Sequence, residues 1–83
     1  MKLLYFAWLR DRIGLAEEEV TPPPGTDTID GLIDWLVGRG EGYGRAFENR
    51  DIIRTAVNQD FASGQTAVGD DDEVAFFPPI TGG

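Results

Sequence analysis

The chain has 83 residues and a formal net charge of −8, with 7 basic residues, 15 acidic residues and no cysteine or histidine. This length allows one domain with one hydrophobic core. The absent residue types exclude disulfides, the usual zinc sites, and thiol or imidazole catalysis. With Lys2 as its only lysine, the chain also lacks the basic surface of a nucleic-acid-binding protein, so a charged partner is expected to be basic.

The segment after Lys2 is a short apolar run rich in residues that favour β-strands. If Lys2 faces water, the alternation of a strand places Leu4 and Phe6 on the same face as Lys2. Leu3 and Tyr5 then point into the core.

The predicted strand (residues 3–7) lies in a short apolar run that ends at Leu9. Arg10, Asp11 and Arg12 follow this run immediately, and no small-residue cleavage site appears, so a signal peptide is not indicated. No apolar stretch approaches the roughly 18 residues of a membrane span. We therefore expect a cytoplasmic protein with no membrane partner. Residues 8–13 have no clear period and predict a turn, or one helical turn, that ends at Gly14.

Residues 16–20 predict a short edge strand, because Glu17, Glu18 and Glu19 would guard such an edge against further pairing. A solvated edge is favoured over a catalytic carboxylate among these three residues. Three consecutive prolines in residues 21–25 then form a stiff loop.

The strongest helix signal is one apolar stripe with the spacing i, i+3, i+4, i+7 and i+8, formed by Ile29, Leu32, Ile33, Leu36 and Val37. Thr28 or Asp27 can cap this helix, and Gly38 with Gly40 can end it. The pattern predicts a helix that covers a sheet.

The glycine-rich run at residues 38–44 lacks the glycine spacing and the lysine of a phosphate-binding loop. We predict a flexible connector that Tyr43 and Phe47 attach to the core. Residues 52–57 predict the next strand, and residues 58–60 predict a turn before Phe61.

Residues 62–69 form a polar connection, and residues 70–72 are three aspartates. These aspartates lack the ligand alternation and the glycine of a calcium loop, so we predict a solvated turn without a metal ion.

Residues 73–77 predict the last strand, with Val74 and Phe76 in the core and Ala75 and Phe77 on the other face. Pro78 and Pro79 remove two backbone donors and end the strand. We therefore divide the chain into a domain at residues 1–77 and a tail at residues 78–83. This tail can extend roughly 20 Å.

The tail ends in Gly82 and Gly83, which carry no Cβ and suit a narrow channel. A frayed end is the alternative, but the order of strand, Pro-Pro, spacer and Gly-Gly favours a functional tail. Leu4, Phe6 and Phe77 are assigned to the sheet face away from the helix, and Phe61 is a further candidate. Exposed apolar residues beside the tail predict a partner surface, unless residues 40–47 cover them.

The predicted order of strand, strand, helix, strand, short strand and strand is that of the ubiquitin-like β-grasp fold. Residues 4–7, 56–59 and 72–83 closely resemble the small subunits of molybdopterin synthase, and the resemblance extends over the whole chain. It departs near Asp71, where family members often have glycine, and at residues 38–44. It implies an α+β fold with a mixed sheet of four to five strands, one main covering helix and a flexible C-terminal Gly-Gly tail.

The resemblance also implies a sulfur carrier in molybdenum cofactor biosynthesis. A ubiquitin-activating-like enzyme would use ATP to adenylate Gly83, and a sulfur donor would displace AMP to leave a thiocarboxylate. The tail would then donate sulfur to cyclic pyranopterin monophosphate in the large synthase subunit, which supplies the catalytic lysines. The chain itself would bind no cofactor or metal, and the family suggests a heterotetramer.

By this resemblance Gly83, with Gly82 before it, is the reactive site. Contacts with partners are expected at Phe6, Phe61, Phe77, Pro78, Pro79, Ile80 and Thr81. Three alternatives stay open: a sulfur carrier of the thiamine type, a ubiquitin-like protein modifier, and an interaction module whose Gly-Gly is incidental.

Overall fold

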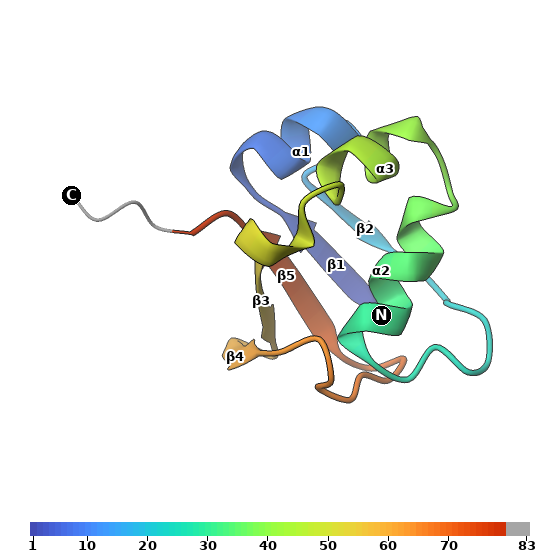
Figure 1. Cartoon of the computed structure of the whole chain (residues 1–83). Coiled ribbons are helices and arrows are strands. Elements are labelled where there is room, and N and C mark those ends of the chain that lie inside the picture. The colour runs from blue at the N-terminus through green and yellow to red at the C-terminus, as the bar shows by residue number, and fades with distance from the viewer. Residues whose placement is uncertain (80–83) are drawn as a thin grey trace.

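The computed structural model describes residues 1–79, which form a mixed five-stranded sheet packed against helices (Figure 1). The strands are β1 (Lys2–Tyr5), β2 (Glu17–Glu19), β3 (Arg54–Val57), β4 (Asp60–Ala62) and β5 (Glu73–Phe77). Their order across the sheet is β2-β1-β5-β3-β4. β1 and β5 run parallel, and the other neighbouring pairs are antiparallel. The strand that leads into the tail therefore lies at the centre of the sheet.

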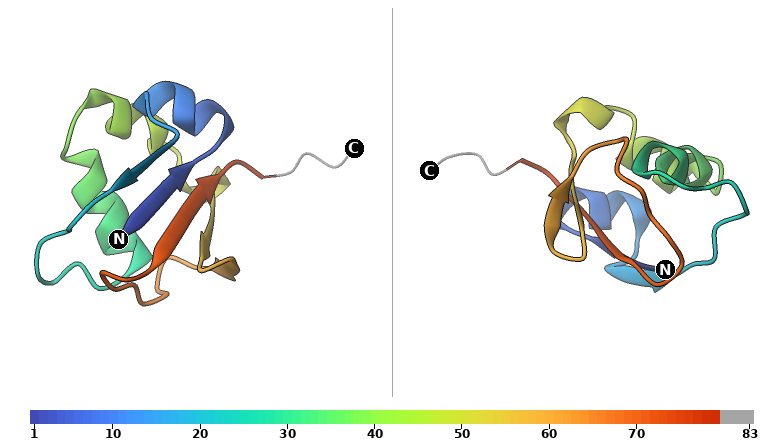
Figure 2. Two further views of the ribbon diagram at one scale, coloured as in Figure 1. Left: turned by 180° about the vertical axis from the view of Figure 1, so that it is seen from behind. Right: turned by 90° about the horizontal axis from the view of Figure 1, so that it is seen from below.

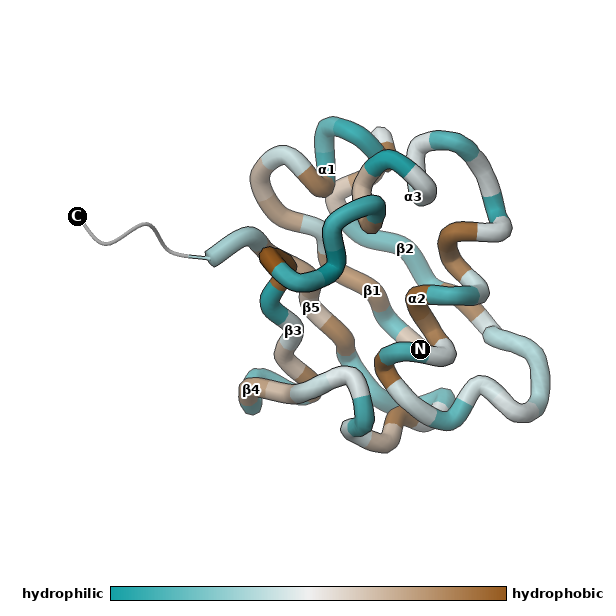
Figure 3. The backbone as a smooth tube through the Cα atoms, viewed as in Figure 1, coloured by the Kyte–Doolittle hydropathy of each residue, from teal (hydrophilic) through white to brown (hydrophobic). Residues whose placement is uncertain are grey.

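The helices are α1 (Ala7–Ile13), α2 (Ile29–Val37), α3 (Glu41–Ala46) and a short 3-10 helix, η1 (Arg50–Ile52). The predicted apolar stripe of α2 is confirmed, and Figure 3 shows polar and apolar residues alternating along this helix. Thr28 is its cap, since the Thr28 hydroxyl oxygen accepts a hydrogen bond from the Gly31 backbone N–H at 3.2 Å.

The core lies between the helices and one face of the sheet. Leu3 and Tyr5 from β1, and Val74 and Phe76 from β5, are buried there as predicted. The Phe76 ring stacks on Tyr5 with a centroid distance of 6.0 Å and meets Phe47 edge-on at 5.0 Å. The view from behind shows the opposite face of the sheet with no helix in front of it (Figure 2).

Two helical segments differ from the prediction. α1 is longer than one helical turn, although it ends at the predicted Gly14, which is left-handed with φ of 90°. The expected flexible connector at residues 38–44 is wrong, because α3 begins within it at Glu41. α3 packs closely on α1: a Cβ on Gly42 would lie 2.6 Å from the Arg12 carbonyl oxygen. Close packing on α1 therefore requires glycine at this position and stabilises α3, although glycine disfavours an isolated helix.

The second half of the sheet begins later than predicted, because η1 occupies the start of the expected strand and β3 begins at Arg54. Asn58 and Gln59 form the predicted turn, with positive φ angles of 51° and 71°, but Asp60, which was also predicted in this turn, begins β4. The Asn58 amide donates to the Asp72 carboxylate at 2.9 Å and accepts from the Glu73 backbone N–H at 3.0 Å. The acidic turn at residues 70–72 is therefore tied to the β3–β4 hairpin.

β2 is an edge strand, as predicted, but Glu18 is not solvated. Its side chain is 12% exposed and accepts hydrogen bonds from the hydroxyls of Tyr5 at 2.8 Å and Tyr43 at 2.6 Å. Arg39 donates to the same carboxylate at 3.0 Å, and its guanidinium lies over the Trp35 and Tyr43 rings. Glu18 therefore joins β2 to β1, α3 and the segment between α2 and α3.

Burial alone would raise the pKa of Glu18, but hydrogen bonds from Tyr43, Tyr5 and Arg39 outweigh burial and lower this pKa below its ordinary value of 4.5. Burial and the hydrogen bond to Glu18 raise the pKa of Tyr43 to about 12, so its phenol stays a neutral donor. The stability that ionised Glu18 contributes is therefore complete above about pH 4.5 and is lost as pH falls through its folded-state pKa.

We expect Glu18→Gln to lower the free energy of unfolding at pH 7 by about 2 kcal/mol, because charged hydrogen bonds at a nearly buried group are lost. The difference from wild type should shrink as pH falls below about 4.5, where wild-type Glu18 also becomes neutral. Urea unfolding at several pH values measures both effects. Glu17→Gln, at an exposed ion pair, is the control and should cost less than about 1 kcal/mol. A pH-independent difference for Glu18→Gln would contradict this account.

Candidate docking surface and tail root

The root of the tail is the end of β5 at Phe77, where the strand was predicted to end. Pro78 and Pro79 follow outside any strand and are half-buried. The other predicted tail contacts and the reactive site, Ile80, Thr81, Gly82 and Gly83, lie outside the described residues.

A row of apolar side chains crosses the sheet on the face away from the helices. Leu4 is the partner of Ala75, Ala75 the partner of Ala56, and Ala56 the partner of Phe61. Paired residues in neighbouring strands share a face, so the row is continuous from β1 to β4. Phe6 and Phe77 extend it towards the tail, since the Phe6 backbone N–H bonds the Phe76 carbonyl at 3.1 Å. We call this set the outer-face patch: Leu4, Phe6, Ala56, Phe61, Ala75 and Phe77.

The aromatic members of the outer-face patch are accessible. Phe61 is 86% exposed, Phe6 is 47% exposed, and Phe77 is half-buried with its ring centroid 6.3 Å from that of Phe61. The alternative in which residues 40–47 cover the patch is wrong, because Ala46 and Phe47 are buried in the core on the opposite face. Among residues 1–79, this is the sheet face that the fold leaves open beside the tail.

Charges border the outer-face patch unevenly. At the end far from the tail, Lys2 is paired in register with Glu19 and Glu73 and lies 3.6 Å from the Glu17 carboxylate. At the tail end, exposed Arg54 is the β-partner of Phe77. The surface therefore changes from acidic, through apolar, to basic towards the root of the tail.

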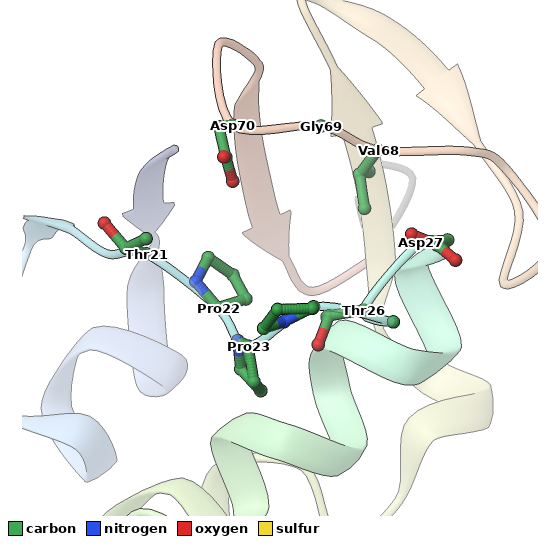
Figure 4. Close-up of a pocket in the computed structure, with 10 residues that line it drawn as sticks. Thr21, Pro22, Pro23, Thr26, Asp27, Val68, Gly69 and Asp70 are labelled. Atoms are coloured by element: carbon green, nitrogen blue, oxygen red, sulfur yellow. The ribbon is translucent and has the colours of Figure 1, made fainter.

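A separate hollow of about 420 Å³ lies between the proline loop before α2 and residues 68–70 (Figure 4). Figure 4 shows the Asp70 carboxylate directed towards Pro22 across it. Residues 68–70 precede β5, whereas the tail follows its other end, so this hollow is remote from the tail root.

Grouped metal ligands and membrane-length helices are both absent from the described part of the chain. Within residues 1–79 no three His, Cys, Asp or Glu side chains are grouped so that they could hold a metal ion. No helix in the same range is long and apolar enough to cross a membrane.

Strand alternation predicted that Phe6 and Phe77 share one face, with Phe61 as a further candidate, and all three lie together there in the structure. Arg54 and Ala56 belong to the same surface but were not predicted to be part of it. The alternation of residues 54–57 carried that signal, but only the pairing of β3 with β5 puts Arg54 beside Phe77.

The same architecture and chain length recur in known proteins. A family model described as the ThiS family matches residues 3–83. The molybdopterin synthase sulfur carrier subunit of Escherichia coli (strain K12) is 35% identical over 83 residues, which cover 100% of this chain and 99% of that protein.

Two solved structures share the fold at 30% identity. One is molybdopterin converting factor, subunit 1, from Pyrococcus furiosus, with a TM-score of 0.77 over 95% of each chain. The other is SAMP1, small archaeal modifier protein 1, from Haloferax volcanii, with a TM-score of 0.75 over 100% of this chain and 98% of that one. The fold is thus the ubiquitin-like β-grasp, and the chain belongs to the ThiS family, alongside the sulfur carrier subunits of molybdopterin synthase.

Proposed function

We propose that this protein is a sulfur carrier in molybdenum cofactor biosynthesis and acts as the small subunit of molybdopterin synthase. Its reactive group is the carboxylate of Gly83, and its partners are an adenylating enzyme of the ubiquitin-activating type and the large synthase subunit. We place this activity in the cytoplasm. The adenylating enzyme consumes the ATP, and the carrier holds no cofactor of its own.

The chemistry follows from the poor reactivity of a carboxylate. Attack of the Gly83 carboxylate on the α-phosphorus of ATP releases pyrophosphate and forms an acyl adenylate. A sulfur donor then displaces AMP, so the C–O bond to phosphate breaks and a C–S bond forms. In the large subunit the thiocarboxylate sulfur attacks cyclic pyranopterin monophosphate and forms a C–S bond to the pterin. Water then cleaves the bond between this sulfur and the Gly83 carbonyl carbon, which leaves the sulfur on the pterin and restores the Gly83 carboxylate. Two such transfers complete the dithiolene.

One observation supports this proposal above the others: the outer-face patch is open and continuous with the root of the tail. A partner that receives the tail can hold the carrier by this patch, because Phe6 and Phe77 lie where β5 gives way to Pro78. The relatives named sulfur carrier subunits support the choice of pathway.

Intact-mass spectrometry tests the proposal. The protein is incubated with ATP, the adenylating enzyme and a sulfur source, and the expected product carries one sulfur in place of one oxygen. Adding the large subunit and its pterin substrate should return the original mass. Loading without discharge would overturn the assignment to this pathway and favour a carrier of the thiamine type. No loading of folded protein would overturn the carrier function itself.

We expect Phe77→Arg to weaken binding to the large subunit at least about 30-fold, because it places a charge in the centre of an apolar contact. Its free energy of unfolding should change by less than about 1 kcal/mol, because Phe77 lies outside the core. Titration calorimetry and urea unfolding measure the two quantities. Gln65→Arg makes the same charge change at an exposed loop residue and should bind as wild type does. Equal binding by both variants would exclude the patch from the interface.

A second candidate function is protein modification, which the likeness to the Haloferax volcanii modifier protein favours. The same adenylated Gly83 would then form an isopeptide bond with a lysine of a target protein. A covalent conjugate, heavier by the mass of this chain less one water, would demonstrate it. A chain that only donates sulfur forms no such conjugate.

A further inference from the structure

The position of Arg54 distinguishes it from every other basic residue of the described chain. It begins β3, is the β-partner of Phe77, and is exposed at the rim of the outer-face patch. Its guanidinium donates to the Asp51 carbonyl oxygen at 3.2 Å, so η1 holds the side chain near the tail root. A cation that is held in place beside an apolar contact is prepared to bind before the partner arrives.

The charge of Arg54 has no carboxylate to neutralise it within residues 1–79. The ion pairs of this part of the chain involve Lys2, Arg10, Arg39, Arg50 and the N-terminus. Lys2, the other basic residue on the sheet face away from the helices, is bordered by three glutamates. The tail end of the outer-face patch therefore presents one uncompensated positive charge on a protein whose net charge is −8.

We propose that Arg54 is a specificity-determining residue, which pairs with a carboxylate of the large synthase subunit at the rim of the channel that receives the tail. This inference rests on the proposed function, because it requires that subunit to dock on the outer-face patch. Phe77 buries apolar area at the centre of the contact, and the ion pair beside it fixes the register of the tail. An acidic rim would also prevent the carrier from docking in the opposite orientation. In that orientation the rim would repel Glu17, Glu19 and Glu73, which surround Lys2 at the other end of the outer-face patch.

Binding of Arg54 variants to the large subunit of the same organism tests the inference. In low salt, we expect Arg54→Gln to weaken binding roughly tenfold and Arg54→Glu to weaken it on the order of 100-fold. Added salt should weaken the binding of wild type, because it screens the ion pair, and should weaken the binding of Arg54→Gln less. It should strengthen the binding of Arg54→Glu, because it screens the repulsion between carboxylates.

Arg45→Glu is the matched control. Arg45 is exposed on α3, on the helical side of the molecule, and its substitution changes the net charge by the same amount. It should bind within about twofold of wild type. If Arg45→Glu and Arg54→Glu weaken binding to the large subunit equally, the effect comes from the overall charge of the protein, and the inference is overturned.

A rescue experiment identifies the partner group. Carboxylates at the rim of the channel in the large subunit are changed to lysine one at a time, and one of these variants should restore binding of Arg54→Glu. If none restores it, the proposed pair does not exist. If wild-type protein neither binds the large subunit nor discharges sulfur to it, the proposed function fails. If wild type does both and Arg54→Glu binds equally well, only the role of Arg54 fails.

Discussion

Gly83→Ala is expected to produce folded protein whose sulfur loading is slower than wild type by on the order of 100-fold. In the proposed reaction, the Gly83 carboxylate must lie in line with the α-phosphorus of ATP inside the adenylating enzyme. A methyl group on the last residue takes space in a channel suited to glycine and moves the carboxylate from its reactive position. Misplacement of about 1 Å is enough for a loss of this size.

Quenched time courses with intact-mass detection give the loading rate, and circular dichroism with urea unfolding checks the fold. Deletion of Gly82 and Gly83 should abolish loading altogether, while the unfolding curve stays that of wild type. Val20→Ala is the control, because it changes a buried core residue far along the chain from the tail. It should lower stability but leave the rate of sulfur loading unchanged. Normal transfer by the deletion variant would support an interaction module with an incidental Gly-Gly.

Phe76→Ala is expected to lower the free energy of unfolding by about 3–5 kcal/mol. Phe76 is fully buried in the central strand, between the rings of Tyr5 and Phe47. Its removal leaves a cavity that β1 and α3 cannot fill without losing their own contacts. The loss is a large share of the roughly 5–15 kcal/mol that stabilises a small domain.

The neighbouring residue gives a sharp control for this prediction. Phe77→Ala makes the same chemical change one position later, on the outer face of the same strand, and should cost about 1 kcal/mol. Urea unfolding of both variants at pH 7 measures the difference. Similar losses for the two variants would mean that β5 does not separate a core face from an open face.

In the proposed function, one strand serves stability through Phe76 and recognition of a partner through Phe77. Strand alternation directs Phe76 to the helices and Phe77 to the outer-face patch, and Pro78 then ends the pairing. The outer-face patch and the start of the tail at Pro78 therefore both adjoin the central strand β5. In the proposed function, this geometry fixes where the tail begins relative to the partner, which lowers the entropy cost of delivering it.

Elements with a local pattern could be predicted from the amino-acid sequence. The stripe of α2, the inward positions of Leu3 and Tyr5, and the end of β5 at Phe77 follow from periodicity and from proline. The resemblance over the whole chain then pointed to the β-grasp fold, which the comparisons with known structures confirm. The predicted roles of Ile80, Thr81, Gly82 and Gly83 stay predictions.

Features that depend on residues far apart in the sequence could not be predicted and became visible in the folded chain. α3 forms despite its glycines because Gly42 lets it approach α1. Glu18 lies against two phenols and Arg39, although it sits in a run of glutamates that predicts a solvated edge. Arg54 reaches the tail root because β3 pairs with β5. In each case the local pattern is weak, and the free energy comes from contacts that exist only once the strands and helices have assembled.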